Sequence, residues 1–171
     1  IIGYTYLIFE KLLLELEKED IQVSCPKGSI FVHFGGWKKL KDKKVSKKKL
    51  NSLITKYLGI SKKNIIDIYG FTEQLGTVYP SIGANGCMVP VYSHVIVRDV
   101  ESLEPVEDGV TGFLQFITPI ALSYPGLSIM NDDLGRIIKR NDNGVEFEVT
   151  GRPKDSEPRG CGDTLPENFL I

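Results

Sequence analysis

NIIDIYGFTEQLG, residues 64–76, joins an apolar stretch to a polar turn. Its first part, residues 64–69, is rich in isoleucine, which predicts a buried β-strand. The turn then presents Tyr69, Thr72 and Glu73. An aromatic ring can stack on a base, a hydroxyl can bond a phosphate oxygen, and a carboxylate can hold Mg²⁺ against phosphates. A strand end followed by an ordinary helical turn is the alternative, but three ligand types so close together favour a binding site.

The residues before this stretch predict a helix, a strand and a second helix. Leucine and isoleucine recur at helical spacing across residues 4–19, with charged residues on the other face. Residues 29–34 are apolar and predict a second buried strand. Ser46 is a suitable N-cap for a helix whose apolar face we expect to contain Leu50, Leu53, Ile54, Tyr57 and Leu58. Strand, helix and strand in this order indicate an α/β layer.

Two glycines, Gly35 and Gly36, follow the strand over residues 29–34. Glycines at the carboxyl end of such a strand allow a ligand to approach the backbone, and ligands of open α/β sheets bind at that edge. The alternative is a tight turn with Trp37 packed in the core. Taken alone, these residues favour the tight turn.

The second half of the chain has the pattern of a β-rich subdomain. Residues 89–100 and 109–118 predict strands. Residues 135–140 and 145–152 flank the sequence NDNG, residues 141–144, which is a strong hairpin-turn signal. We therefore expect a distorted barrel or sheet packed beside the α/β layer.

These patterns predict three parts of the chain. Residues 1–85 would form the α/β layer with its two ligand-binding turns, and residues 86–152 the β-rich subdomain. Residues 153–171 are polar and contain proline, glycine and acidic residues, which is typical of an exposed hinge and C-terminal tail.

Composition limits the classes of function. The chain has 171 residues, of which 42% are hydrophobic and 25% charged, as is usual for one globular domain. A net charge of −1 gives no global field that would recruit nucleic acid, and the lysine-rich residues 38–49 are expected to form a solvated face. No apolar run approaches the roughly 20 residues that a membrane span needs. The chain does not begin with Met, which suggests a piece of a longer protein, although processing would give the same start.

The cysteines indicate a reducing cytoplasm. Cys25, Cys87 and Cys161 are odd in number and widely spaced, which argues against a disulfide framework and a zinc site. Cys161 lies in the polar tail, where Arg159 would slightly favour its thiolate. An incidental surface cysteine is the alternative.

The order of these segments resembles a known superfamily. Tyr69-Gly70-Phe71-Thr72-Glu73 resembles the Tyr-Gly-x-Thr-Glu motif of adenylate-forming enzymes, which include acyl-CoA synthetases, luciferase and peptide-synthetase adenylation domains. Gly35-Gly36 resembles the glycine turn beside the adenine in these enzymes. Residues 109–137 resemble the stretch that ends at the ribose-binding aspartate, and GRPKD, residues 151–155, resembles the hinge. Within the superfamily, HFGGWKK (33–39) and EPRGCG (157–162) are similar to the LuxE-like acyl-protein synthetases.

The resemblance implies a fold and a role for individual residues. The fold would be the C-terminal part of an adenylate-forming large domain, in the α/β class. ATP and Mg²⁺ would be bound. The implied roles are stacking on adenine for Tyr69, lining of the adenine for Gly35 and Gly36, and cofactor binding for Gly70. The resemblance further implies α-phosphate contact for Thr72, Mg²⁺ binding for Glu73, ribose binding for Asp133, ribose or phosphate contact for Arg152, a hinge for Asp155 and acyl acceptance for Cys161. Asn131-Asp132 replaces the usual Thr-Gly, so either Asp132 or Asp133 could be the ribose ligand.

The implied activity is ATP-dependent activation of a fatty acid and its transfer to a protein cysteine, in the service of an acyl-reductase partner and related to bacterial bioluminescence. A phosphate-binding loop would precede Ile1, and a chain that ends soon after the hinge suits acyl-protein synthetases. Two alternatives stay open. One is a phenylacetate-CoA-ligase-like acyl-CoA synthetase, in which coenzyme A accepts the acyl group. The other is an inactive scaffold fragment that binds the reductase.

Overall fold

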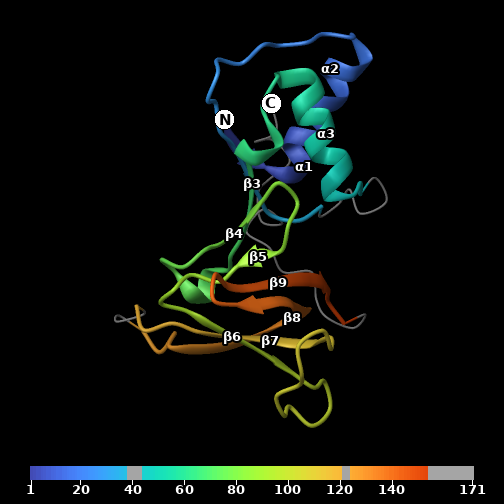
Figure 1. Ribbon diagram of the computed structural model, residues 1–171. Coiled ribbons are helices and arrows are strands. Elements are labelled where there is room, and N and C mark those ends of the chain that lie inside the picture. Colours follow the sequence, from blue (N-terminus) through green and yellow to red (C-terminus); the bar gives the residue numbers. More distant parts are fainter. Residues whose placement is uncertain (38–43, 121–123, 154–171) are drawn as a thin grey trace. The chain divides into compact units, whose positions relative to one another are not determined.

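The computed structural model describes residues 1–37, 44–120 and 124–153 (Figure 1). They form two compact units, which divide between Ile65 and Ile66. No helix within the described ranges is long and apolar enough to cross a membrane. The described α-helices lie in the first unit, and the second contains a five-stranded antiparallel sheet.

A continuous helical segment opens the first unit and confirms the helix expected within residues 4–19. It consists of α1 (Thr5–Leu7), η1 (Ile8–Leu13) and α2 (Leu14–Lys18). The middle part, η1, is a π-helix, a widened turn that is rare in helices. Ile8, Phe9 and Leu13 are buried there, so the widened turn supplies the apolar face of the segment.

The second helix, α3 (Lys47–Leu58), begins at the predicted cap. The Ser46 hydroxyl oxygen accepts a hydrogen bond from the Lys49 backbone N–H at 3.2 Å, which satisfies one of the free donors of the first turn. All five residues of the predicted apolar face are buried. They pack in one core with the buried residues of η1 and with Phe31. A short 3₁₀ turn, η3 (Lys62–Asn64), follows.

Two parallel strands complete the first unit. β1 (Ile2–Tyr4) pairs with β2 (Phe31–Phe34), which confirms the strand predicted over residues 29–34. Trp37 is half-buried and packs against this core, with its ring centroid 5.0 Å from that of Phe9. The described residues here show a bend at Gly35 and a packed Trp37.

The border between the units crosses β3 (Ile65–Tyr69), the strand predicted over residues 64–69. β3 leads into the 3₁₀ turn η4 (Thr72–Gln74) and then pairs antiparallel with β4 (Tyr79–Ile82). This pairing and the aromatic side chains of both strands place residues 66–85 in the second unit. The compact units therefore differ from the predicted division after residue 85, and the assignment of functional domains stays a prediction.

The main sheet of the second unit has the strand order β5-β9-β8-β7-β6 (Figure 1). Its neighbours are all antiparallel, which confirms the predicted β-rich second half. The strands are β5 (Cys87–Met88), β6 (His94–Arg98), β7 (Gly112–Ile117), β8 (Ser128–Asn141) and β9 (Gly144–Gly151).

β6 is shorter than the strand expected over residues 89–100, because a turn limits it at each end. Before it, the Ser93 N–H donates to the Pro90 carbonyl at 2.9 Å. After it, the Asp99 carboxylate accepts from the backbone N–H groups of Glu101 and Ser102, at 3.0 and 2.9 Å. An aspartate that bonds the backbone two or three residues ahead forms a turn in place of a strand.

The hairpin of β8 and β9 confirms the turn predicted from NDNG. Asn141 pairs with Gly144 at its tip. β8 extends well before the predicted residue 135, because it also pairs with β7 from Ser128 onward. At the open end of the hairpin, Leu134 lies opposite Gly151. This register brings the residues just before Leu134 next to the residue just after Gly151.

The core of the second unit is aromatic. Tyr79, Phe116 and Phe147 are fully buried, and Tyr69 and Phe71 pack against them. The Tyr69 ring centroid lies 5.8 Å from that of Phe116 and 5.8 Å from that of Phe147. The ring of Tyr69, at the end of β3, thus packs against this core.

Candidate functional site

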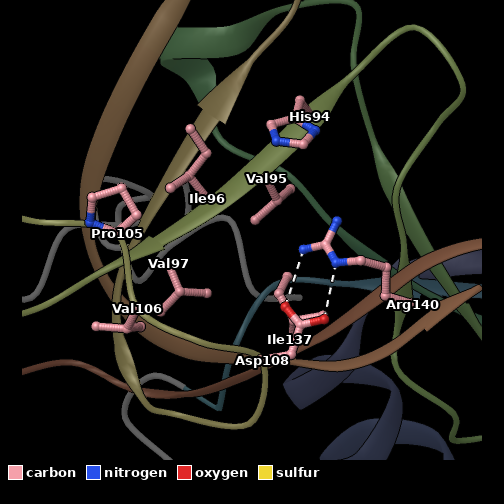
Figure 2. A pocket seen from close by; sticks show the side chains of 9 residues that line it. All are labelled: His94, Val95, Ile96, Val97, Pro105, Val106, Asp108, Ile137 and Arg140. Carbon is pink, nitrogen blue, oxygen red and sulfur yellow. Dashed lines mark hydrogen bonds and ion pairs between the residues drawn. The ribbon is translucent and has the colours of Figure 1, made fainter.

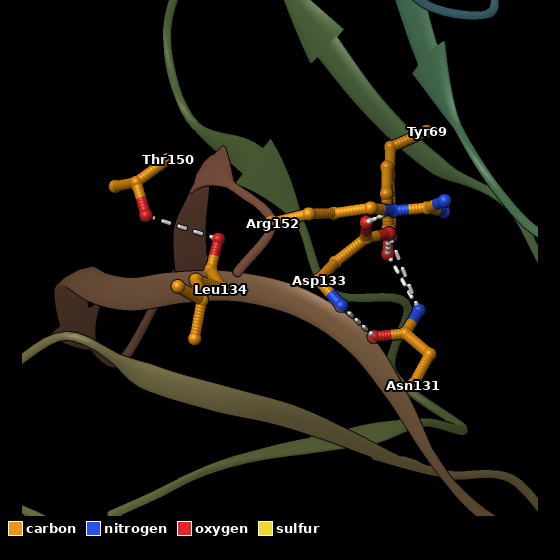
Figure 3. Close-up of polar contacts among 6 residues, drawn as sticks. All are labelled: Tyr69, Asn131, Asp133, Leu134, Thr150 and Arg152. Atoms are coloured by element: carbon orange, nitrogen blue, oxygen red, sulfur yellow. Dashed lines mark hydrogen bonds and ion pairs between the residues drawn. The ribbon is translucent and has the colours of Figure 1, made fainter. Parts of the chain in front are cut away.

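Three of the predicted residues meet at the open end of the β8–β9 hairpin (Figure 3). The Tyr69 hydroxyl donates to Asp133 Oδ2 at 2.6 Å, and Arg152 Nε donates to Asp133 Oδ1 at 2.6 Å. Close by, the Thr150 hydroxyl donates to the Leu134 carbonyl at 3.1 Å and ties β9 to β8 beside the carboxylate. The end of β3 and the two strands of the hairpin therefore supply one shared polar network.

The strand geometry separates the two candidate aspartates. Successive residues of a strand point to opposite faces. Asp133 is buried, with 8% of its surface exposed, whereas Asp132 is exposed. Asp133 is thus the carboxylate that joins Tyr69 and Arg152, and of the two aspartates it is the candidate ribose ligand.

Electrostatics fix the protonation of the two partners of Asp133. Burial, and then the charge of the nearby Asp133 carboxylate, raise the pKa of the Tyr69 phenol well above its ordinary value. The hydrogen bond to Asp133 raises the pKa of Arg152 further above neutrality. Tyr69 is therefore a neutral donor and Arg152 a cation at physiological pH.

The structure shows Tyr69 in two settings at once. Its ring packs in the aromatic core, while its hydroxyl faces the Asp133 carboxylate (Figure 3). Such a ring is held in one orientation by its neighbours. Contact between this ring and adenine stays a prediction.

Thr72 and Glu73 lie on the exposed turn η4. The Thr72 hydroxyl donates to Glu73 Oε2 at 3.2 Å. The next residue, Gln74, is buried and accepts a hydrogen bond from the Tyr79 hydroxyl at 2.6 Å, which anchors the turn to the core. The turn thus presents a hydroxyl and a carboxylate to solvent on a fixed base.

The residues of this turn fit an Mg²⁺ ion that arrives with a nucleotide. Magnesium takes oxygen ligands and is usually held by one or two carboxylates together with substrate phosphates. Glu73 supplies one exposed carboxylate. In the part of the chain that the structure describes, no group of three or more His, Cys, Asp or Glu could form an all-protein metal site.

Gly70 connects Tyr69 to the exposed turn, and the fold does not require a glycine there. A Cβ at Gly70 would lie 3.8 Å from the Thr77 carbonyl oxygen and 3.8 Å from Val78 Cγ1, which are ordinary contacts. A ligand that approaches the backbone closely would favour glycine at position 70, because glycine has no side chain. Its role in cofactor binding stays a prediction.

Gly35 and Gly36 follow β2 in the first unit, whereas the other described site residues belong to the second. Gly35 has a φ of 77°, which suits glycine, and both residues are exposed. Their assembly with Tyr69 into one adenine site stays a prediction. Cys161 and Asp155 lie outside the described residues.

A separate cavity of about 290 Å³ lies elsewhere in the second unit (Figure 2). It is lined mainly by β6 and by Val106, Ile137 and the ion pair of Asp108 with Arg140. None of the predicted site residues lines it. Converging polar groups, rather than the size of a cavity, identify the Asp133 network as the candidate site.

Asn131 is a member of the network that the sequence did not identify. Its Nδ2 donates to the Tyr69 hydroxyl at 2.8 Å, and its Oδ1 accepts from the Asp133 N–H at 3.1 Å. The strand period of two was the available signal, because residues 131 and 133 of one strand share a face. Asn131, which differs from the superfamily pattern at this position, is thus hydrogen-bonded to two members of the network.

Curated relatives of the chain carry one name. A long-chain-fatty-acid–luciferin-component ligase of Vibrio harveyi is 25% identical over 138 residues, which cover 79% of this chain and 36% of the relative. The protein of the same name from Aliivibrio fischeri is 29% identical over 143 residues, covering 79% of this chain and 37% of the relative. The chain spans just over a third of the length of these relatives.

Solved structures share the fold. A long-chain-fatty-acid-CoA ligase, FadD1 of Archaeoglobus fulgidus, matches 90% of this chain and 34% of its own with a TM-score of 0.61 and 15% identity. ATP-bound MatB of Rhodopseudomonas palustris matches 88% of this chain and 30% of its own with a TM-score of 0.55 and 13% identity. These likenesses confirm the predicted fold class: the chain has the α/β fold of the matched third of these structures.

The family follows from a match over almost the whole chain. A family model described as "Acyl-protein synthetase, LuxE" matches residues 1–170. This match includes every residue of the predicted site, from Gly35 to Cys161. The chain therefore belongs to the LuxE family of acyl-protein synthetases.

Proposed function

We propose that this chain is the nucleotide-binding portion of a ligase that activates a long-chain fatty acid with ATP and transfers it to a protein cysteine. The observation that carries the proposal is the network of Tyr69, Asp133 and Arg152, in a member of the LuxE family. Two relatives named as long-chain-fatty-acid–luciferin-component ligases support the fatty-acid substrate. A structural neighbour solved with ATP supports the nucleotide.

The network suits the recognition of a nucleoside. The buried Asp133 carboxylate is held on both oxygens, so it meets a ribose hydroxyl as a preorganised acceptor. The ring of Tyr69 contacts adenine, and Gly70 lets the base approach the backbone. The Arg152 cation balances the charge of Asp133, and its proposed role is contact with ribose or phosphate.

The chemistry begins with formation of an acyl-adenylate. A carboxylate oxygen of the fatty acid attacks the α-phosphorus of ATP, the bond to the bridging oxygen breaks, and pyrophosphate leaves. The Thr72 hydroxyl donates to an α-phosphate oxygen, and the carboxylate of Glu73 would hold Mg²⁺. Bound Mg²⁺ neutralises negative charge on the phosphates during the transfer.

The acyl group then passes to sulfur. A cysteine thiolate, for which Cys161 is the candidate, attacks the acyl carbonyl carbon and AMP leaves with the electron pair of the broken bond. A protein thioester of this kind can deliver the acyl group to a reductase partner. A cysteine that must stay reduced for this step suits the cytoplasm.

Substitution of Glu73 tests the nucleotide assignment. We expect Glu73→Gln to reduce ATP–pyrophosphate exchange by about 100-fold or more, in line with the loss of one electrostatic group at a phosphoryl-transfer site. The measurement uses the complete gene product that carries this chain, with a fatty acid and Mg²⁺. Glu73 is exposed, and a glutamine at this position can still accept the hydrogen bond from the Thr72 hydroxyl. The thermal unfolding midpoint of the variant should therefore not change.

Glu107→Gln is the matched control, because Glu107 is also exposed and lies in a loop away from the network. Equal exchange by the Glu73→Gln variant and the control would end the Mg²⁺ assignment. If the unaltered gene product itself catalyses no exchange with any fatty acid, the scaffold alternative stands in place of the ligase.

The acceptor distinguishes the ligase from its nearest alternative. The name of the FadD1 neighbour, a long-chain-fatty-acid-CoA ligase, supports a reading in which coenzyme A accepts the acyl group. With a labelled fatty acid and ATP, we expect the complete protein to become covalently labelled and the Cys161→Ser variant to stay unlabelled. Undiminished labelling of the variant, or formation of acyl-CoA without labelled protein, would favour the alternative.

A further inference from the structure

We propose that Asn131 is a positioning residue that makes the network selective for a ribonucleotide, an inference that rests on the proposed function. Asn131 and Asp133 lie two positions apart on β8, so both side chains belong to the same face of the sheet. Asn131 would act through Asp133 and Tyr69 rather than on the nucleotide itself. No role for this side chain follows from the superfamily motif, which has another residue type here.

The amide orientation of Asn131 is determined by its partners. Its Oδ1 accepts from the Asp133 backbone N–H, a group that can only donate. The Nδ2 end must therefore face the Tyr69 hydroxyl at 2.8 Å and Asp133 Oδ2 at 3.4 Å (Figure 3). A flipped amide would place two donors against one another, so the orientation is fixed without reference to any ligand.

The Asn131 amide also fixes the direction of the Tyr69 hydroxyl. A phenol has one O–H donor, and here it accepts from Asn131 while it donates to Asp133 at 2.6 Å. Without Asn131, the Tyr69 hydroxyl would lose this donor, and only its hydrogen bond to Asp133 would orient it. The side chain therefore couples the residue assigned to the base with the residue assigned to the ribose.

The Asp133 carboxylate keeps one acceptor position that a ribose hydroxyl can use. Among the described residues, three donors converge on the Asp133 carboxylate, from Tyr69, Asn131 and Arg152. A carboxylate has about four acceptor positions. One further donor, such as a sugar hydroxyl, can bind without displacing any of these partners. Loss of the Asn131 amide would remove one donor from Asp133 Oδ2 and the donor that the Tyr69 hydroxyl accepts from, which would weaken that one contact selectively.

Nucleotide analogues measure this effect directly. Dissociation constants of ATP, 2′-deoxy-ATP and 3′-deoxy-ATP are determined by equilibrium dialysis on the complete gene product. We expect the unaltered protein to prefer ATP over at least one deoxy analogue by about tenfold or more, the equivalent of one hydrogen bond to a charged group. Asn131→Ala and the isosteric Asn131→Asp should reduce this preference to less than about threefold, mainly through weaker ATP binding.

The control and the overturning results are distinct from those of the proposed function. Asn85→Ala, at an exposed position, should keep the full preference for ATP. If both Asn131 variants keep it as well, the inference fails while the ligase proposal stands. If the unaltered protein binds none of the three nucleotides, the ligase proposal and the inference fail together. A loss of fold in Asn131→Ala would be recognised by its unfolding midpoint, and Asn131→Asp then decides.

Discussion

Two Asp–Arg ion pairs of the second unit use the same residue types in different surroundings. Asp133 and Arg152 meet at 2.6 Å, with 11% and 36% of their side chains exposed. Asp108 and Arg140 form two hydrogen bonds, at 2.9 and 3.1 Å, but their side chains are 45% and 44% exposed. The first carboxylate also accepts from the Tyr69 hydroxyl, whereas the second lines the cavity whose residues Figure 2 shows.

The difference shows that good ion-pair geometry does not by itself mark a site. A two-pronged pair in solvent contributes little, because water and salt screen it. A carboxylate removed from water needs every donor that reaches it, and it is fixed by them in one orientation. Asp133 has this character and Asp108 does not.

The largest effect should come from Gly135→Ala, which disturbs the strand that carries Asp133. A Cβ at Gly135 would overlap with the backbone carbonyl oxygen of Glu148 and lie 2.9 Å from Leu114 Cδ1. Backbone cannot move aside as a flexible side chain can, so the paired strands must shift. We expect a loss of about 3 kcal/mol in the free energy of unfolding, measured with urea, and weaker ATP binding.

Gly109→Ala is the matched substitution beside the exposed pair. Gly109 has a φ of 92° but no atom within 4 Å of an added Cβ. Only the backbone conformation is strained, at a cost of about 1 kcal/mol. If Gly135→Ala proved as mild as Gly109→Ala, the β8–β9 register that supports the network would be wrong.

A moderate effect should come from removal of the buried carboxylate. Asp133→Ala leaves the Tyr69 hydroxyl and the Arg152 guanidinium without their acceptor, and we expect a loss of about 2 kcal/mol in the free energy of unfolding. Asp108→Ala should cost less than about 1 kcal/mol, since both ends of that pair are in solvent. Urea unfolding of the two variants compares them directly, and equal losses would remove the distinction between the pairs.

Local patterns predicted much of the fold. The cap at Ser46 and the apolar face of α3 depend on neighbours three or four residues apart, and both are as predicted. The strand β2 and the hairpin turn at residues 141–144 likewise depend on short segments. β6 was predicted too long, because its ends are set by turns at Pro90 and Asp99 that override an extended preference.

The site was predictable where it depends on motif residues and not where it depends on strand register. The choice between Asp132 and Asp133, and the part played by Asn131, follow from which face of β8 meets Tyr69. That face is set by the pairing of β8 with both β7 and β9, including a register shift next to Leu134. The packing of the Tyr69 ring on Phe116 and Phe147 likewise joins residues far apart in sequence.

The smallest effect should come from the exposed pair, and its pH dependence has a definite sign. The hydrogen bond from Arg140 lowers the pKa of Asp108 below its ordinary value. A carboxyl whose pKa is depressed by folding stabilises the protein above its unfolded pKa, near 4, and loses this contribution as pH falls through the lower folded pKa. Arg140→Gln should therefore cost about 0.5 kcal/mol at pH 7 and progressively less below about pH 4.

Salt concentration is the second variable, besides pH, in the comparison of the unaltered protein with Arg140→Gln. In 1 M NaCl the screening length is about 3 Å, so the difference between the unaltered protein and Arg140→Gln at pH 7 should shrink toward zero. Urea unfolding at two pH values and two salt concentrations gives all four differences. A loss well above 1 kcal/mol that persists in salt and acid would place Asp108 in the same class as Asp133, because only a carboxylate shielded from solvent resists screening in this way.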